Sequence, residues 1–172
     1  MTEELGIALA QINPTVGDIL GNLDIIRSAR KSVDGTSDIV VTGELAVSGY
    51  PPEDLVLKPA FLEMIETEVN KLALETNDGG PALLIGAPWR ENGELFNAAL
   101  LLADGAVVTK RYKHVLPTYG VFDEDRVFSR GPIPGPIAFK GVRLGVMICE
   151  DMWEQDVAEG LQESGAEILI VI

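Results

Sequence analysis

The sequence predicts an α/β fold in which early strands are joined by helices and later strands by tight turns. Short apolar runs bounded by Gly, Pro and Asn indicate buried strands, and segments with apolar residues three or four positions apart separate the first of these runs. With 172 residues, 47% of them hydrophobic, the chain can bury one sizeable core. We therefore expect residues 1–172 to form a single domain.

Two strand–helix units are predicted in the first half of the chain. Residues 6–12 form a short apolar run, and from Asn22 onward apolar residues recur at helical spacing. Residues 38–43 predict a second buried strand, which a polar, proline-rich segment at 48–54 closes. A longer helix follows, with one apolar face made by Phe61, Ile65, Val69 and Leu72.

The second half begins with consecutive hairpins. Residues 82–87 predict a third strand, and the turn signals Glu91-Asn-Gly93 and Asp104-Gly105 flank the apolar run 96–102, which is followed by a further strand at 106–112. Here the connections change from crossovers to a meander.

The last third combines a long loop with another strand–helix–strand unit. Residues 113–135 are rich in Pro, Gly and charge and predict an ordered functional loop. The expected unit has a strand at 142–148, a helix at 153–164 that ends before Gly165, and a buried strand at 167–172.

Charge excludes two classes of partner. The chain has 13 basic and 27 acidic residues and a net charge of −14, which repels phosphate backbones and anionic lipid surfaces. We expect neither nucleic-acid nor membrane binding. The acidic start, Met1 to Leu5, lacks the basic region of a signal peptide, and the single cysteine, Cys149, cannot form an internal disulfide. These features favour the reducing cytoplasm.

Three chemically useful side chains follow three predicted strands. Glu44 comes after the strand at 38–43, Lys113 after the strand at 106–112, and Cys149 after the strand at 142–148. Loops at the carboxyl ends of strands converge in α/β sheets, so these residues are candidates for one site.

Cys149 is the candidate nucleophile. Its position at a strand-to-helix turn favours a thiolate, whereas the charges of Glu150 and Asp151 oppose one. A glutamate within hydrogen-bond reach would instead accept the thiol proton during attack. Taken singly, each residue also has a structural interpretation: Cys149 as a small buried hydrophobe, Glu44 as a loop anchor and Lys113 as a surface charge.

His114, the only histidine, supports an alternative Cys–His mechanism. Neighbouring residues of an extended segment point to opposite faces. If Lys113 faces the site, His114 therefore faces away from it, and a structural role for His114 is favoured.

The three segments together resemble a known family. Gly43-Glu-Leu-Ala-Val-Ser-Gly-Tyr-Pro-Pro-Glu-Asp-Leu55, Lys113-His-Val-Leu-Pro-Thr-Tyr-Gly-Val-Phe-Asp-Glu124 and Gly145-Val-Met-Ile-Cys-Glu-Asp-Met-Trp153 are similar to the glutamate, lysine and cysteine motifs of the nitrilase, or carbon-nitrogen hydrolase, superfamily. The sequences of the first two motifs resemble those of the amino-terminal glutaminase domain of glutamine-dependent NAD synthetases.

This resemblance implies a four-layer αββα sandwich and a glutamine amidohydrolase with the triad Glu44, Lys113 and Cys149. It further implies that Tyr50, Tyr119 and Glu150 line the substrate pocket. Glu124 matches the additional buried glutamate of many superfamily members, with an exposed acid as the alternative.

The resemblance also implies missing parts. Domains of this kind are longer and precede a synthetase domain, so we expect an amino-terminal fragment that lacks the last strands. No Gly-rich phosphate loop is present; we expect ATP and Mg²⁺ only in the synthetase domain and no cofactor or metal in this one. The edge formed by residues 168–172 favours a homo-oligomer. Another amidase or nitrilase activity and a non-catalytic scaffold are the alternatives.

Overall fold

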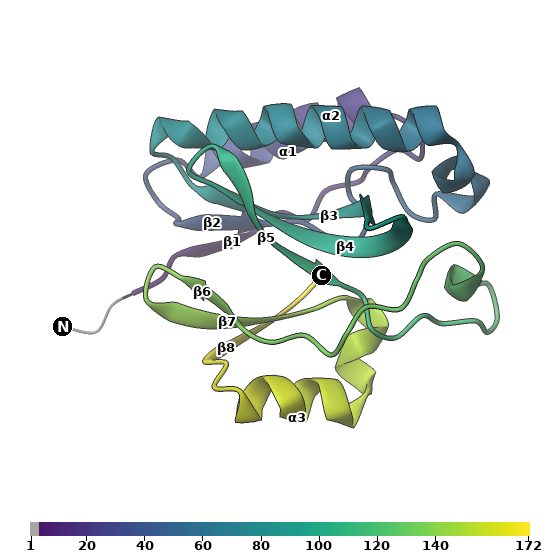
Figure 1. Cartoon of the computed structure of the whole chain (residues 1–172). Coiled ribbons are helices and arrows are strands. Elements are labelled where there is room, and N and C mark those ends of the chain that lie inside the picture. The colour runs from purple at the N-terminus through teal and green to yellow at the C-terminus, as the bar shows by residue number, and fades with distance from the viewer. Residues whose placement is uncertain (1–3) are drawn as a thin grey trace.

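The computed structural model describes residues 4–172 and contains two β-sheets (Figure 1). Met1 to Glu3, part of the acidic start that argued against a signal peptide, lie outside the described residues. No helix in the described part of the chain is long and apolar enough to cross a membrane.

The first sheet has the order β1-β2-β3-β4-β5. Its strands are β1 (Ile7–Leu9), β2 (Ile39–Val41), β3 (Ala82–Glu91), β4 (Glu94–Ala103) and β5 (Ala106–Tyr112). The first three strands pair in parallel, and β3, β4 and β5 pair antiparallel. The predicted change from crossover to hairpin connections is confirmed.

The second sheet has the order β6-β7-β8. Its strands are β6 (Ile137–Phe139), β7 (Val142–Met147) and β8 (Ile168–Val171). Strands β6 and β7 pair antiparallel, and β7 and β8 pair in parallel. Strand β6 was not predicted, because its three residues directly follow the Pro- and Gly-rich segment 131–136, which is typical of a loop.

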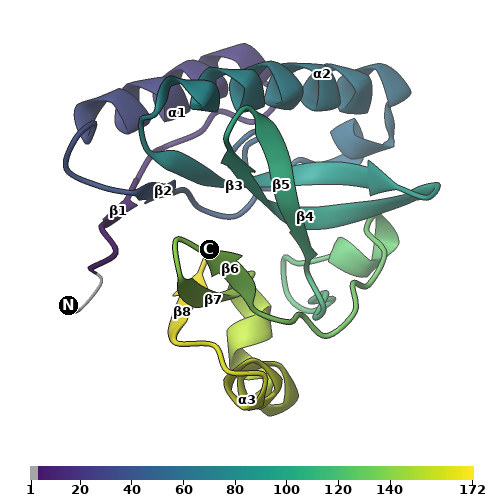
Figure 2. The same cartoon turned by 60° about the vertical axis from the view of Figure 1, so that its left-hand side comes forward.

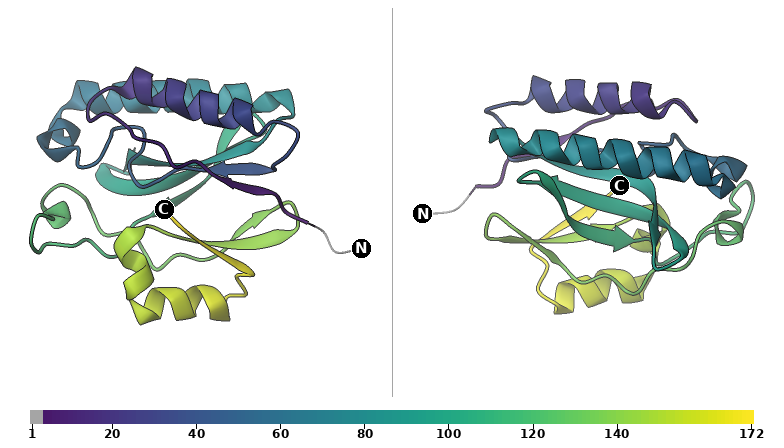
Figure 3. Two further views of the ribbon diagram at one scale, coloured as in Figure 1. Left: turned by 180° about the vertical axis from the view of Figure 1, so that it is seen from behind. Right: turned by 45° about the horizontal axis from the view of Figure 1, so that its top comes forward.

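Helices cover the outer face of each sheet. Helices α1 (Ile19–Ser32) and α2 (Pro59–Glu75) lie over the first sheet, and α3 (Gln155–Glu163) lies under the second (Figure 2). The views in Figure 3 show the same helix–sheet–sheet–helix order from behind and above. This is the αββα arrangement that the resemblance implied. Four short 3₁₀ segments complete the described secondary structure: η1 (Glu53–Leu57), η2 (Thr76–Asp78), η3 (Glu124–Arg126) and η4 (Cys149–Trp153).

The alternation of side chains along the central strands builds two separate cores. On β3, Leu83 and Ile85 pack against the helices, whereas Ala82 and Leu84 pack against the second sheet. The second sheet contributes Leu144, Val146 and Ile170 to the inter-sheet core. Because successive side chains point to opposite faces, one apolar strand can fill both layers.

Turn chemistry explains the hairpins. Asn92 and Gly93 have φ of 53° and 86°, and Asp104 and Gly105 have φ of 51° and 81°. Two consecutive residues with positive φ match the twist of the flanking strands, and Asn, Asp and Gly tolerate this conformation best.

Some predicted boundaries differ from the structure. The helix expected at 153–164 begins at Gln155, because Cys149–Trp153 forms a 3₁₀ segment that turns the chain first. Strand β3 extends to Glu91, beyond the predicted end at Ala87, because its hairpin partner β4 continues the pairing.

Candidate active site

A close approach of two backbones positions Glu44 at the carboxyl end of β2. A Cβ atom on Gly86 of β3 would lie 2.4 Å from the Leu45 nitrogen and 2.5 Å from the Gly43 oxygen. Only glycine therefore lets the turn that carries Glu44 cross β3 at this distance. The turn is tied down where the Val47 N–H donates to the Gly86 carbonyl oxygen over 3.0 Å.

Lys113, directly after β5, is fully buried between two carboxylates. Its Nζ lies 2.6 Å from Glu44 Oε1 and 2.8 Å from Glu124 Oε1. The side chain of Lys113 is 0% exposed, which contradicts the surface-charge interpretation, and Glu124 is buried, which contradicts the exposed-acid interpretation. Buried charges require partners of this kind.

The pKa values reflect this pairing. Burial alone would lower the pKa of Lys113, but the Glu44 and Glu124 carboxylates outweigh it and the pKa of Lys113 rises above its ordinary value. Burial raises the pKa of Glu124, and the adjacent Lys113 ammonium only partly opposes this. The lysine is therefore charged at neutral pH and holds both acids in place.

Cys149 is the first residue of η4, at the sharp turn that follows β7. Its φ is 45°, a left-handed conformation that costs a non-glycine residue about 1–2 kcal/mol. The Cys149 N–H donates to the Ile172 carbonyl oxygen over 2.8 Å, which helps to hold the turn. The thiol is half-buried.

The thiol is protonated in the resting chain. Burial first, and then the charge of Glu44, raise the pKa of Cys149 from 9.0 to about 11. The helix-terminus effect that favoured a thiolate does not prevail, and Glu44 rather than Glu150 or Asp151 is the main opposing charge. An attacking Cys149 consequently needs a base to remove its proton.

Asp151 acts on the backbone and not on the thiol. Its Oδ1 accepts hydrogen bonds from the N–H groups of His114 and Val115, at 3.0 and 2.8 Å, and its Oδ2 accepts one from the Ile148 N–H at 3.1 Å. This buried carboxylate thereby joins the segment after Lys113 to the segment before Cys149. The sequence showed only an acid beside the thiol, and no local pattern pointed to the clamp.

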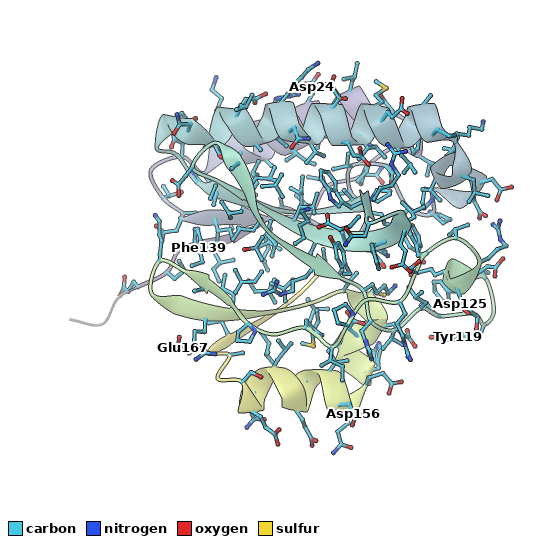
Figure 4. All side chains as sticks on the ribbon, viewed as in Figure 1. Asp24, Tyr119, Asp125, Phe139, Asp156 and Glu167 are labelled. Carbon is cyan, nitrogen blue, oxygen red and sulfur yellow. The ribbon has the colours of Figure 1, made fainter. Side chains whose placement is uncertain are left out.

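Two of the three predicted pocket residues, Tyr119 and Glu150, pair with each other, and the third, Tyr50, pairs with the supporting acid Glu124. The Tyr119 hydroxyl donates to Glu150 Oε1 over 2.8 Å, and the Tyr50 hydroxyl donates to Glu124 Oε1 over 3.3 Å. Tyr119 lies on the loop that follows β5, at the side of the molecule (Figure 4). Both tyrosine rings are partly exposed, so they are available to a ligand.

His114 has a structural partner. Its Nδ1 lies 2.7 Å from the Gly131 carbonyl oxygen, within the loop that follows β5. The expectation that His114 turns away from the neighbouring Lys113 agrees with this contact.

Cavity volume alone would not identify this site. A hollow of about 710 Å³ lies at the amino ends of β1, β2 and β3, and Asp34, Asp38 and Lys140 are among its lining residues. Glu44 lies at the opposite end of β2, beside a smaller hollow of about 240 Å³ that Tyr50 also lines. In the described part of the chain, no three His, Cys, Asp or Glu side chains are placed to hold a metal ion.

The sequence model of the carbon-nitrogen hydrolase family matches residues 6–172. The chain belongs to this family. Its architecture agrees, because an amidase from Nesterenkonia sp., at 25% identity, superimposes with a TM-score of 0.81 over 97% of this chain and 64% of that one.

Closer similarity is to glutamine-dependent NAD(+) synthetases. The Rhodobacter capsulatus protein is 42% identical over 99% of this chain and 31% of its own length. The structure of the Acinetobacter baumannii synthetase in complex with ADP, at 32% identity, gives a TM-score of 0.89 over 98% of this chain and 32% of that one. The chain thus spans about a third of the length of these relatives, within which it matches the nitrilase-type domain.

Proposed function

We propose that this domain hydrolyses the side-chain amide of glutamine with Cys149 as nucleophile and Glu44 and Lys113 as its catalytic partners. The observation that carries the proposal is the fully buried Lys113 ammonium, 2.6 Å from Glu44, beside a thiol whose pKa the charge of Glu44 helps to raise. A partly buried base, a buried cation and a protonated thiol are the groups that amide cleavage needs. The relatives named glutamine-dependent NAD(+) synthetases support glutamine as the substrate.

The first half of the reaction forms a thioester. Glu44 accepts the Cys149 proton while the sulfur attacks the amide carbon, and the carbonyl oxygen becomes an oxyanion. Lys113 Nζ has three N–H donors. One donor serves Glu44. The two Glu124 oxygens, each 2.8 Å from Nζ, share a second donor, so the third is assigned to the oxyanion, together with the backbone N–H after Cys149. The carbon–nitrogen bond then breaks, and the proton held by Glu44 leaves with ammonia.

The second half regenerates the thiol. Glu44 removes a proton from water, the resulting oxygen nucleophile attacks the thioester carbon, and the carbon–sulfur bond breaks. The sulfur takes back the proton from Glu44, and glutamate is released. One base thus transfers a proton in each direction in both halves, which suits a residue held rigidly by Lys113.

Substrate recognition is assigned to the two tyrosine–glutamate pairs. The Glu150 carboxylate would bind the α-ammonium group of glutamine, and the hydrogen bond from Tyr119 would fix the position of the Glu150 carboxylate. Tyr50 would line the same pocket beside Glu124.

The released ammonia would serve NAD synthesis in a synthetase domain, as the names of the relatives suggest. We assign the use of ATP and Mg²⁺ to that domain and the whole reaction to the reducing cytoplasm, where Cys149 remains a free thiol. Homo-oligomer formation through the edge of β8, where Leu169 and Val171 are partly exposed, belongs to the same proposal.

Intact mass after incubation with an electrophilic glutamine analogue tests the substrate assignment. A single adduct that disappears in Cys149→Ala is expected. The similarity to an amidase favours a second candidate, another amide substrate. If simple aliphatic amides acylate Cys149 and the glutamine analogue does not react, glutamine is not the substrate. A folded chain in which Cys149 reacts with neither would indicate a non-catalytic scaffold.

A further inference from the structure

Asn97 is an unusual residue in the centre of the first sheet. It is 0% exposed and lies on β4, where it is followed only by apolar residues from Ala98 to Ala103. Its position in the strand places it on the same face as Ala99 and Leu101, which faces the second sheet. Burying a primary amide among apolar residues lowers stability unless the amide forms compensating hydrogen bonds.

The hydrogen bonds of Asn97 go to the candidate catalytic group. Its Nδ2 donates to Glu44 Oε1 over 2.7 Å and to Glu124 Oε2 over 3.4 Å. Its backbone oxygen accepts a hydrogen bond from the Lys113 N–H over 2.8 Å. Asn97 therefore contacts every member of the buried Glu–Lys–Glu cluster.

The other end of the amide has no such use. Asn97 Oδ1 is buried and has no hydrogen-bond partner among residues 4–172. The favourable interactions of this side chain consequently come from its two Nδ2 hydrogens, each of which points to one carboxylate.

We infer that Asn97 is a positioning residue that holds the Glu44 carboxylate in place as the base for Cys149. This inference rests on the proposed function and deepens it. Two carboxylates share one buried ammonium, so Lys113 alone cannot satisfy all four of their oxygens. A neutral donor between them adds a hydrogen bond to each carboxylate without adding a second positive charge beside the base.

Orientation follows from the same contacts. Lys113 Nζ and Asn97 Nδ2 both bind Glu44 Oε1, at 2.6 and 2.7 Å. With Oε1 occupied by two donors, Oε2 is the oxygen assigned to the Cys149 proton. The two donors fix the plane of the carboxylate from different strands, since Lys113 follows β5 and Asn97 belongs to β4.

The test is the pH dependence of Cys149 modification in Asn97→Leu, which keeps the branched shape of the side chain and removes the donor. Rates of adduct formation are measured by intact mass, with iodoacetamide and separately with an electrophilic glutamine analogue. We expect the acid limb of the rate profile to move to higher pH by about one unit or more, since a hydrogen bond to a charged group contributes about 1.5–3 kcal/mol. At a pH on that limb, the rate should fall about tenfold or more.

A second variant and a matched control complete the design. Asn97→Asp also keeps the shape, and a third carboxyl group makes the cluster retain a proton to higher pH, so its acid limb should move in the same direction. If Asn97→Leu does not fold, the pH profile of Asn97→Asp tests the role of Asn97 instead. Asn22 is another buried asparagine, whose Nδ2 donates to the Thr15 and Val47 carbonyl oxygens. Asn22→Leu should lower stability and leave the profile in place.

An unshifted profile in folded Asn97→Leu or Asn97→Asp, or a shift no larger than that of Asn22→Leu, would overturn the inference. The two reagents separate it from the proposed function. If wild-type Cys149 reacts with iodoacetamide and not with the glutamine analogue, the substrate assignment fails, whereas the iodoacetamide profiles still decide the role of Asn97.

Discussion

Replacing Asp151 by asparagine should destabilise the chain by orphaning at least one buried N–H group. Asp151 Oδ1 accepts two hydrogen bonds and Oδ2 accepts one, from Ile148. Asparagine has a single oxygen, so its NH₂ group must face at least the Ile148 N–H. An unsatisfied buried donor costs about 1–3 kcal/mol, and we expect a loss of this size for Asp151→Asn.

Asp151→Ala should be more damaging, because it removes all three acceptor contacts. Each orphaned N–H would cost about 1–3 kcal/mol, partly offset because a buried carboxylate, whose pKa burial raises, is removed as well. A net loss of about 3 kcal/mol or more is expected. That is a large fraction of the 5–15 kcal/mol that typically separates folded and unfolded domains.

Urea unfolding followed by tryptophan fluorescence measures these losses. Trp89 is buried and Trp153 exposed, so the fluorescence change on unfolding reports mainly on the core around Trp89. The matched control is Asp18→Asn at the amino end of α1, where Asp18 accepts from the Gly21 N–H and asparagine is an equally good cap. Equal midpoints for Asp151→Asn and Asp18→Asn would refute the clamp.

Four further outcomes are expected. Lys113→Met leaves two buried carboxylates without their cation and should cost about 3–5 kcal/mol in urea unfolding, whereas a change below 1 kcal/mol would show that the ion pairs add little. Gly86→Ala places a Cβ against backbone and should cost about 1–3 kcal/mol and slow Cys149 modification; Gly135→Ala, with open space around its Cβ, is the control and should do neither. The pKa of Cys149 is raised from 9.0 to about 11 in the folded chain. The difference in unfolding free energy between the wild type and Cys149→Ala should therefore be constant below pH 9 and decline as the pH rises through 11. A constant difference across this pH range would contradict the raised pKa. His114→Ala should leave acylation of Cys149 intact, and its loss in the folded variant would favour a Cys–His mechanism.

Local signals predicted most of the fold. The helical spacing of Ile65, Val69 and Leu72 placed α2, and Asn92-Gly93 and Asp104-Gly105 placed both hairpins. These signals depend on residues a few positions apart, whose periodicity and backbone preferences act within one element. Strand β6 was not detected because it directly follows the Pro- and Gly-rich segment 131–136, and only its pairing with β7 shows it to be a strand.

The positions of the candidate residues were also visible in the sequence, since each follows an apolar run at the end of a strand. Their surroundings were not. Lys113 contacts Glu44, 69 residues away, and Glu124, 11 residues away. Whether such a lysine is solvated or buried depends on which loops cover it, and loops pack according to the whole fold.

The sequence by itself therefore determined the order of strands and helices, the hairpins and the three residues on which a hydrolytic mechanism would depend. Only the tertiary structure decided that Cys149 is a protonated thiol, that Asp151 accepts hydrogen bonds from backbone N–H groups, and that Asn97 donates a hydrogen bond to Glu44. The physical reason is that desolvation and hydrogen bonding depend on distances between elements far apart in the chain, and local periodicity carries no information about these distances.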